Sequence, residues 1–252
     1  MLVGQRRDFL LDRLSRDGRV IAKDAAAELG VSEDSVRRDL RDLAAAGLCQ
    51  RVYGGALPVS PAVADYATRQ RVAVDSKHRV ARAAAALVQP GSTVLLDGGT
   101  TTLAVVAALP RDLAATVVTH SPTVAAALVE HPTVEVFLLG GRLFKHSAVA
   151  CGAATAEAAQ AVSADVFLLG VTGVHPEAGR TTGDADEAAM KRVLAGRSAE
   201  TYVLASAEKI GAASRYAVLP LSAVNGVVTD APADDPTVQR LRDTGTVVLP
   251  AG

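Results

Sequence analysis

The sequence contains no tryptophan, and phenylalanine and tyrosine bring the aromatic share to only 3%. So few aromatic side chains argue against a protein that stacks single-stranded bases on aromatic platforms. The two cysteines, Cys49 and Cys151, lie far apart and outside any Cys-x-x-Cys spacing. This arrangement excludes a disulfide framework and a structural zinc site, and it indicates a reducing compartment, so we expect a cytoplasmic protein.

A long hydrophobic run is also missing. The uncharged stretch 113–129 is interrupted by histidine, serine, proline and threonine at 120–123, which excludes a membrane span. At the N-terminus, charge appears at Arg6, before a signal-like apolar core can form. We therefore expect no membrane partner.

The chain has no strong charge of one sign, since 26 Lys and Arg face 27 Asp and Glu, for a net charge of -1. Over the whole chain, this balance argues against a nucleic-acid binder. The charges are unevenly distributed, however. Residues 1–55 carry 10 basic and 9 acidic side chains, against 16 and 18 in the rest, so the front is about twice as densely charged. The total thus averages two parts of different character.

A length of 252 residues suits one large and one small domain. We place the small domain at residues 1–57 and the large one at 77–252. Residues 58–76, which begin Pro-Val-Ser-Pro, are expected to be a linker that starts as extended chain.

In the large domain, short apolar runs alternate with helix-length segments. This alternation is typical of a parallel sheet covered on both faces, so we predict a doubly wound α/β domain. The strand order is left open. The predicted strands are 93–97, 115–119, 134–139, 166–171, 201–205, 224–229 and 247–249; the predicted helices are 77–88, 103–109, 122–130, 155–162 and 184–197.

The small domain shows the pattern of a winged helix-turn-helix. We predict helices at 5–15 and 22–29, then a third that starts at the N-cap Ser32 and stops at Gly47. A strand over 48–52 and the turn 53–55 would form the wing. In this arrangement the third helix enters the major groove of DNA. The alternative is an ordinary three-helix bundle with a solvated charged face.

The third helix carries exposed arginines opposite its apolar stripe, and residues 36–55 hold two more arginines than carboxylates. Asp39 is expected to pair with an arginine within the protein. Glu33 either repels DNA or accepts from a cytosine amino group. The side chains expected to contact double-stranded DNA are Ser32, Ser35, Arg37, Arg38, Arg41, Arg51 and Tyr53.

A second candidate site follows the strand that ends at Asp97. The sequence Gly98-Gly99-Thr100-Thr101-Thr102 leads from this strand into a helix, where free backbone N–H groups and hydroxyls can hold an anion. It matches neither the nucleoside-triphosphate nor the dinucleotide glycine motif, so a small phosphorylated compound fits best. The alternative is a tight turn that merely starts a helix.

These segments resemble the DeoR family of bacterial transcriptional regulators. Residues 31–40, VSEDSVRRDL, and the turn YGGA at 53–56 resemble its DNA-binding domain, and LDGGTTT at 96–102 resembles the signature of its effector domain. The resemblance implies a sensor domain similar in fold to ribose-5-phosphate isomerase. It also implies a repressor of a sugar-metabolism operon that binds a phosphorylated sugar or related metabolite and acts as a homodimer or homotetramer.

Further blocks extend the likeness to most of the chain after residue 77, among them LLGGR at 138–142, Thr181-Thr182 and Glu187 with Lys191. The histidines and cysteines show no metal-ligand spacing, so we expect no metal, and we expect no cofactor. The effector contacts that the resemblance implies are Asp97, Gly98, Gly99, Thr100, Thr101, Thr102, His120, Gly141, Arg142, Thr172, Lys191 and Lys209.

The chain departs from the family pattern at three positions. His120, Thr172 and Ser206 stand where the family usually has an asparagine and two aspartates. A more anionic or differently hydroxylated effector would fit these changes, and so would a weak or silent pocket. An isomerase would need a general base. Because Thr172 replaces the expected acid, and only Glu187 and Asp97 remain, we expect no enzyme and no catalytic residue. An architectural DNA binder without an effector is a further alternative.

Overall fold

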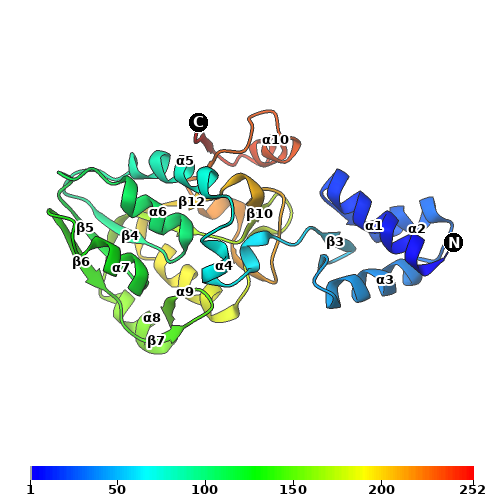
Figure 1. Ribbon diagram of the computed structural model, residues 1–252, viewed down its shortest axis with the longest axis horizontal. Coiled ribbons are helices and arrows are strands. Elements are labelled where there is room, and N and C mark those ends of the chain that lie inside the picture. The colour runs from blue at the N-terminus through cyan, green and yellow to red at the C-terminus, as the bar shows by residue number, and fades with distance from the viewer. Residues whose placement is uncertain (1) are drawn as a thin grey trace.

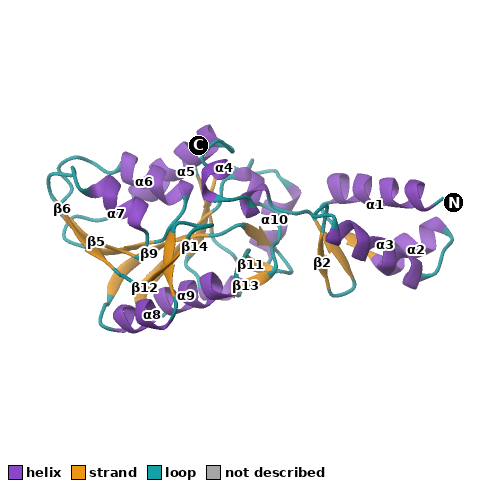
Figure 2. Ribbon diagram, turned by 60° about the horizontal axis from the view of Figure 1, so that its bottom comes forward, coloured by secondary structure: helices purple, strands orange, loops and turns teal. Residues whose placement is uncertain are grey.

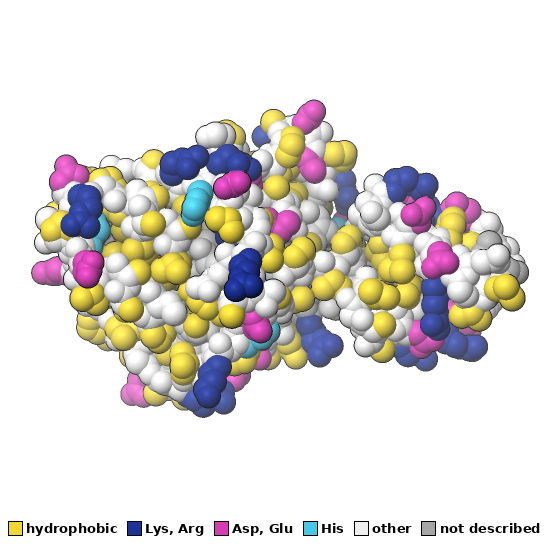
Figure 3. All heavy atoms as spheres, viewed as in Figure 1, with side chains coloured by type: hydrophobic (Ala, Val, Ile, Leu, Met, Phe, Trp, Pro, Cys, Tyr) yellow, Lys and Arg dark blue, Asp and Glu magenta, His cyan; other side chains and the backbone are white. Residues whose placement is uncertain are grey.

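The computed structural model describes residues 2–252, which form two domains joined by a narrow neck (Figures 1 and 3). The smaller, N-terminal domain contains three helices and a three-stranded antiparallel sheet. Its elements are α1 (Val3–Asp17), β1 (Val20–Ile21), α2 (Ala22–Leu29), α3 (Glu33–Ala45), β2 (Gln50–Val52) and β3 (Gly55–Leu57). The strands lie in the order β1-β3-β2. The predicted helices and wing are therefore confirmed.

The core of the N-terminal domain follows from the apolar stripe of α3. Val36, Leu40 and Leu43 are buried there against Leu10 and Leu14 of α1. Their spacing of four and three residues places all three on one face of the helix, which leaves the arginines on the opposite face. Gly30, with φ +64°, adopts the left-handed conformation that ends α2 and turns the chain toward α3.

Residues 58–76 pack on the large domain instead of spanning open space. After an extended start, the chain forms a 3-10 turn at Pro61–Val63 and the short helix α4 (Tyr66–Arg69). Val59 bridges to Ala213, and the backbone N–H of Tyr66 donates to the carbonyl of His146 at 2.9 Å. The segment expected to be a linker therefore brings its side chains to the surface of the large domain.

A seven-stranded parallel sheet forms the centre of the large domain. The strands are β4 (Thr93–Leu96), β5 (Ala115–Thr119), β6 (Val134–Leu138), β9 (Ala164–Gly170), β12 (Ser198–Leu204), β14 (Gly226–Thr229) and β15 (Val248–Pro250). Each corresponds to one of the seven predicted runs. The strands lie in the order β15-β14-β12-β9-β4-β5-β6, and all of them are parallel. From β4 the chain adds strands first on one side of the sheet, β5 and β6, and then on the other, starting with β9, so the order in which strands are added switches sides between β4 and β9. Open α/β sheets bind ligands at such a switch point, beyond the carboxyl ends of the strands.

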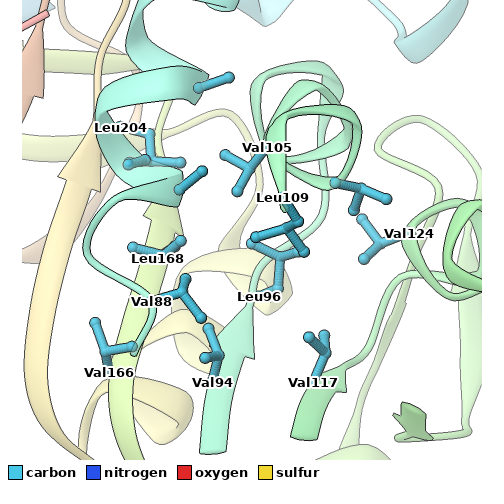
Figure 4. Packing of buried hydrophobic residues seen from close by; sticks show 14 of the residues in the cluster. Val88, Val94, Leu96, Val105, Leu109, Val117, Val124, Val166, Leu168 and Leu204 are labelled. Carbon is cyan, nitrogen blue, oxygen red and sulfur yellow. The ribbon is translucent and has the colours of Figure 1, made fainter. Parts of the chain in front are cut away.

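Helices cover both faces of this sheet (Figure 2). One face packs against α5 (Val74–Ala85), α6 (Thr100–Ala108) and α7 (Pro122–Leu128), and the other against α8 (Ala153–Gln160), α9 (Ala185–Ala195) and Leu241 of α10 (Pro236–Asp243). Successive strand residues point to opposite faces, so Val94 and Leu96 belong to the first core and Leu95 to the second. Figure 4 shows Leu96 packed near Leu109 and Val105, and Val94 near Val88, in the first of these cores.

Several elements were not predicted. Two small antiparallel sheets lie beside the central sheet: β7 (Arg142–Phe144) pairs with β8 (Val149–Cys151), and β11 (Gly179–Thr182) lies between β10 (Gly173–His175) and β13 (Tyr216–Leu219). Helix α10 was also missed. None of the helices in the described part of the chain has the length and apolar character that a membrane span requires.

Candidate functional site

The outer face of α3 presents the polar side chains of the first candidate site. Ser32 caps the helix, because its Oγ accepts a hydrogen bond from the backbone N–H of Ser35 at 3.3 Å. Arg37, Arg38 and Arg41 are exposed along the helix. In the wing, Arg51 is exposed and Tyr53 is fully exposed. The structure thus brings the predicted DNA-contacting residues to one region of the domain.

The acidic side chains of α3 have different roles. Asp39 is buried and forms an ion pair with Arg6 of α1 at 2.7 Å, so it fixes α3 to α1, as the sequence predicts for an internal partner. Glu33 pairs with Arg37 one turn later at 2.6 Å. The hydrogen bond and the charge of Glu33 raise the pKa of Arg37. The sequence predicted that Glu33 would either repel DNA or accept from a cytosine amino group, and it did not predict this pair with Arg37.

Three arginines of this region make no ion pair with any residue of 2–252: Arg38, Arg41 and Arg51. A groove between α3 and the wing is lined by Arg37, Arg51 and Tyr53, among others. Figure 3 shows Lys and Arg side chains gathered along the lower edge of this domain, where Figure 1 places α3. Unpaired guanidinium groups beside a groove suit phosphate and base-edge contacts.

The second candidate site lies at the switch point of the large sheet. The loop after β4 and the first turn of α6 form part of its wall, and Gly170, at the end of β9, forms another part with Val171 and Thr172. Helix α6 begins at Thr100, three residues earlier than predicted, so the threonines lie in its first turn. No side chain caps its N-terminus. The free N–H groups of this turn therefore face the pocket and favour an anion.

Asp97 joins the elements behind the pocket. Its carboxylate accepts hydrogen bonds from the backbone N–H groups of Gly98 and Gly170 at 2.8 and 2.9 Å, and it pairs with Lys191 of α9. Nε2 of His120 lies 2.8 Å from the same carboxylate. Burial acts to raise the pKa of Asp97, but Lys191 and His120 outweigh it and lower the pKa to about 2. This buried carboxylate therefore holds the pocket together and is not free to act as a base.

Four basic side chains reach the pocket: Arg69, Lys77, Lys191 and Lys209. Lys209 is buried, its Nζ donates to Oγ1 of Thr101 at 3.1 Å, and burial lowers its pKa to about 8. Burial also lowers the pKa of Lys77 and of Arg69. For Lys191, burial acts in the same direction, but the charges of Asp97 and Glu187 outweigh it and raise its pKa.

The structure places the predicted effector residues in three groups. Those that line the pocket are Gly98, Gly99, Thr100, Thr101, Thr102, Thr172, Lys191 and Lys209. Asp97 and His120 are fully buried behind it. Gly141 and Arg142 do not reach it. Gly141 packs against Thr155, and Arg142 lies on β7 with an exposed side chain that pairs with Asp186 at 3.1 Å. Because the β7–β8 hairpin folds beside the central sheet, Arg142 lies on the surface and outside the lining of the pocket.

Sequence reasoning missed several pocket residues. Arg69 and Lys77 line the pocket because α4 and the start of α5 fold over it. The sequence indicated a linker for the segment that holds Arg69, and a helix from Lys77 onward without a role in the pocket. Glu187 and Glu208 also line it. Oε2 of Glu208 and Nε of Arg69 are buried without a hydrogen-bond partner in the described part of the chain. The available signal was the pair of arginines, Arg69 and Arg71, in a segment whose other charged residues are Asp65 and Asp75.

The three departures from the family pattern each have a structural role. Both ring nitrogens of His120 lie 2.8 Å from acceptors, Asp97 and the carbonyl of Ala150, so both donate when the ring is protonated. Thr172 lines the pocket and donates to the carbonyl of Thr181 at 3.0 Å. Ser206 is buried and donates to Glu208 at 2.6 Å. His120 therefore braces the pocket wall and is not on its surface.

Comparison with known families matches both domains. Residues 6–62 match the DeoR-like helix-turn-helix domain, and residues 72–231 match the DeoR C terminal sensor domain. The chain is 30% identical to a putative aga operon transcriptional repressor of Escherichia coli over 98% of its own length and 94% of that protein. It is 29% identical to the glycerol-3-phosphate regulon repressor of Escherichia coli, over 95% of each chain.

Solved structures show more distant likenesses. The sorbitol operon regulator SorC of Klebsiella pneumoniae is 12% identical, with a TM-score of 0.42 over 95% of this chain and 98% of that one. Ribose 5-phosphate isomerase A of Methanocaldococcus jannaschii is 16% identical, with a TM-score of 0.41 over 54% of each chain.

Proposed function

Since the chain belongs to the DeoR family of transcriptional regulators, we propose that it represses a sugar-metabolism operon and responds to a phosphorylated metabolite. The N-terminal domain binds operator DNA. The metabolite binds at the N-terminus of α6 and changes the affinity of the chain for that DNA. The repressors named for the aga operon and the glycerol-3-phosphate regulon support this assignment.

The observation that carries the proposal is the charge of the pocket. Four basic side chains and the uncapped N-terminus of α6 surround it, against two glutamates on its surface. Lys209 and Lys77 are buried there with few protein partners, and burial lowers the pKa of each. A bound phosphate supplies the countercharge that these groups lack, with hydroxyls of Thr100–Thr102 as further donors.

Glu187 and Glu208 add hydrogen-bond acceptors to the basic pocket. A carboxylate is an acceptor of hydrogen bonds from hydroxyl groups. Oε2 of Glu208 is buried without a partner among the described residues, so it can accept from a hydroxyl of the ligand. A pocket that combines cations for a phosphate with acceptors for hydroxyl groups fits a phosphorylated sugar or polyol.

DNA recognition uses α3 and the wing. Arg38 and Arg41 are the side chains of α3 that reach bases and phosphates, with Arg51 and Tyr53 of the wing beside them. One recognition helix per chain supplies few contacts. We infer that the chain acts as a homodimer or homotetramer, because paired recognition helices bind two half-sites of an operator at a fixed spacing.

The chain is a regulator and not an enzyme, in line with the regulators among its relatives. Aldose–ketose isomerisation requires a general base, commonly a carboxylate, held over the substrate. Asp97 is tied to Lys191 and His120, and Glu187 accepts from Ser147 and Thr182 at 3.1 and 3.2 Å. Glu208 also lines the pocket, and its Oε1 accepts from Ser206 at 2.6 Å.

The test begins with selection of binding sites from random double-stranded DNA by the full chain, which should yield paired half-sites. Thermal unfolding with glycerol 3-phosphate, ribose 5-phosphate and inorganic phosphate then tests the pocket. We expect stabilisation by at least one of them, and its loss in Lys209→Gln but not in Lys145→Gln. Lys145 is exposed, which makes it a matched control. Failure of all three probes to stabilise the wild type would contradict the phosphate pocket.

A further inference from the structure

The two domains touch through a hairpin of the large domain. Strands β10 and β11 are joined by the three-residue turn Pro176–Ala178, and Gly179 follows in the left-handed conformation with φ +70°. At the tip, Oε1 of Glu177 accepts from the guanidinium of Arg19 in the N-terminal domain at 3.0 Å. Arg240 of α10 donates to the same oxygen. The tip of the hairpin is thus a docking point for the N-terminal domain.

The opposite end of this hairpin lies in the effector pocket. Thr172, directly before β10, and Thr182, the last residue of β11, both line the pocket. Oγ1 of Thr182 donates to Glu187, another pocket residue, at 3.2 Å. A ligand that contacts this wall therefore contacts the base of the hairpin directly.

The hairpin is short and tightly held. Three residue pairs, from Gly173–Thr181 to His175–Gly179, separate the base from the tip. At about 3.3 Å per residue this is roughly 10 Å. A Cβ at Gly173 would lie 2.4 Å from the carbonyl oxygen of Ala212, so the strand packs closely against the neighbouring loop. Such a unit tilts or shifts as one body, since it has little room to deform internally.

The same neighbouring loop holds the chain that leaves the N-terminal domain. The backbone N–H of Ala213 donates to the carbonyl of Pro58 at 3.4 Å, and Val59 bridges to Ala213. The next residue, Ser214, bonds to Thr172 through its hydroxyl at 2.7 Å. The loop begins at the pocket residue Lys209. The N-terminal domain is therefore connected to the large domain at two places, the tip of the hairpin and the residues Pro58 and Val59. Both places are attached to segments that line the pocket.

We propose that the β10–β11 hairpin transmits ligand occupancy of the pocket to the DNA-binding domain through the contact between Glu177 and Arg19. The proposal rests on the proposed function, because it assumes a ligand in that pocket. The ligand must favour one of two arrangements of the domains, docked or released at the tip, and the arrangement sets how the recognition helices meet an operator.

The contact between Arg19 and Glu177 is weak enough to form and break as the domains dock and release. Arg19 and Glu177 remain about half exposed, at 44% and 54%, and an exposed pair contributes little stability. A cavity of about 420 Å³ lies beside it, between Ile21 and Val52 of the N-terminal domain and Ala178 of the hairpin. The interface is thus incompletely packed, so a small shift of the hairpin can release the domain at little cost.

The experiment compares Arg19→Gln, Glu177→Gln and the double variant in the full chain. Arg16→Gln is the matched control, because Arg16 is an equally charged, exposed residue near the same end of α1 that pairs with Asp17 in its own domain. Operator affinity is measured with and without ribose 5-phosphate, and with inorganic phosphate at matched ionic strength. Hydrogen exchange of the backbone amides of Glu177 and Ala178 reports docking without any ligand.

We expect Arg19→Gln to reduce the ligand-induced change in operator affinity by about two- to fivefold, the factor that an exposed ion pair supplies. Ligand affinity, read from thermal shift, should stay unchanged. The double variant should behave like Glu177→Gln alone, because each single change breaks the contact between Arg19 and Glu177. Glu177→Gln in addition removes the charge that pairs with Arg240. Exchange at the tip should be faster in Arg19→Gln and unaltered in Arg16→Gln.

The failures of the two proposals are distinguishable. Unchanged exchange at the tip in Arg19→Gln overturns the docking contact and leaves the pocket intact. A ligand that binds the wild type and alters operator affinity equally in Arg19→Gln overturns transmission through the tip. A wild type that binds neither probe contradicts the phosphate pocket itself, and transmission with it.

Discussion

Among single residues, Arg38 gives the clearest test of DNA recognition, because it has no ion-pair partner among the described residues that a substitution would disturb. It is exposed on α3 without an ion pair in the described chain, whereas Arg37 is held by Glu33 and Asp39 by Arg6. We predict that Arg38→Ala weakens operator binding by about 1–3 kcal/mol and relaxes the sequence preference. The fold should be unaffected. Anisotropy titrations at fixed salt against selected and scrambled DNA measure both effects, and unaltered affinity would remove Arg38 from the interface.

Lys209 makes the pocket sensitive to pH. Burial lowers its pKa to about 8 from the ordinary 10.5, so above pH 8 the folded chain holds fewer protons here than the unfolded chain. The stability of the ligand-free protein should therefore rise between about pH 8 and 10.5 through this group. Anion binding needs the charged lysine, so phosphate affinity should fall over the same range.

The stability of the ligand-free protein should rise with pH while phosphate affinity falls, and this difference tests the role of Lys209. Thermal unfolding between pH 7 and 9.5, with and without inorganic phosphate, should show the phosphate-induced increase in Tm shrinking as pH rises. Because phosphate has its own titration near pH 6 to 7, it is fully dianionic throughout the upper part of this range. In Lys209→Gln the phosphate-induced increase should be absent at every pH. A wild-type increase independent of pH would show that Lys209 does not pair with the anion.

At the level of elements, the loop between β4 and α6 depends on the glycine that starts it. A Cβ at Gly98 would lie 2.0 Å from Cγ1 of Val149 and 3.2 Å from Cβ of Ser121. We predict that Gly98→Ala lowers stability by about 1–3 kcal/mol, the usual cost of overpacking, and weakens ligand binding by displacing the loop. Gly140→Ala is the control, because nothing lies within 4 Å of a Cβ there. Equal Tm values for the two variants would contradict the close packing.

The β10–β11 hairpin carries a buried cation. Arg180 is fully buried, its guanidinium donates to the carbonyl of Pro220 at 2.6 Å, and two of its nitrogens lack partners among the described residues. Burial lowers its pKa to about 10. We predict that Arg180→Met raises Tm, since a methionine of similar length fills the space without desolvating a charge. A loss of stability similar to that of Arg180→Ala would indicate a countercharge for this arginine.

The same elements show how far sequence patterns reach. Continuous apolar runs marked all seven strands of the parallel sheet. Central strands such as β9 are buried on both faces and contain little else, whereas the edge strand β6 carries an apolar run although most of it is exposed. The small antiparallel strands were missed because β10 and β11 are short and rich in glycine, threonine and one buried arginine. The loop after Asp97 was predicted from its glycines and threonines. Arg69 and Lys77 were missed because only the tertiary fold brings α4 over the pocket.

In the whole molecule, a net charge of -1 hides two separate groups of basic side chains, one in each domain. The N-terminal domain directs unpaired arginines outward, while the large domain directs its cations inward to a pocket. Because each chain offers few phosphate contacts, operator binding should depend on paired chains. It should fall steeply with salt, since each neutralised phosphate releases counterions.

The central claim is that occupancy of the α6 pocket controls operator affinity. The most direct measurement is the operator dissociation constant of the full chain, with and without glycerol 3-phosphate or ribose 5-phosphate at constant ionic strength, for the wild type and Lys209→Gln. We predict a change of about 5- to 150-fold in the wild type, the usual range of allosteric coupling, and none in the variant. A ligand effect of equal size in both proteins, or an operator affinity that no phosphorylated ligand alters, would contradict the account.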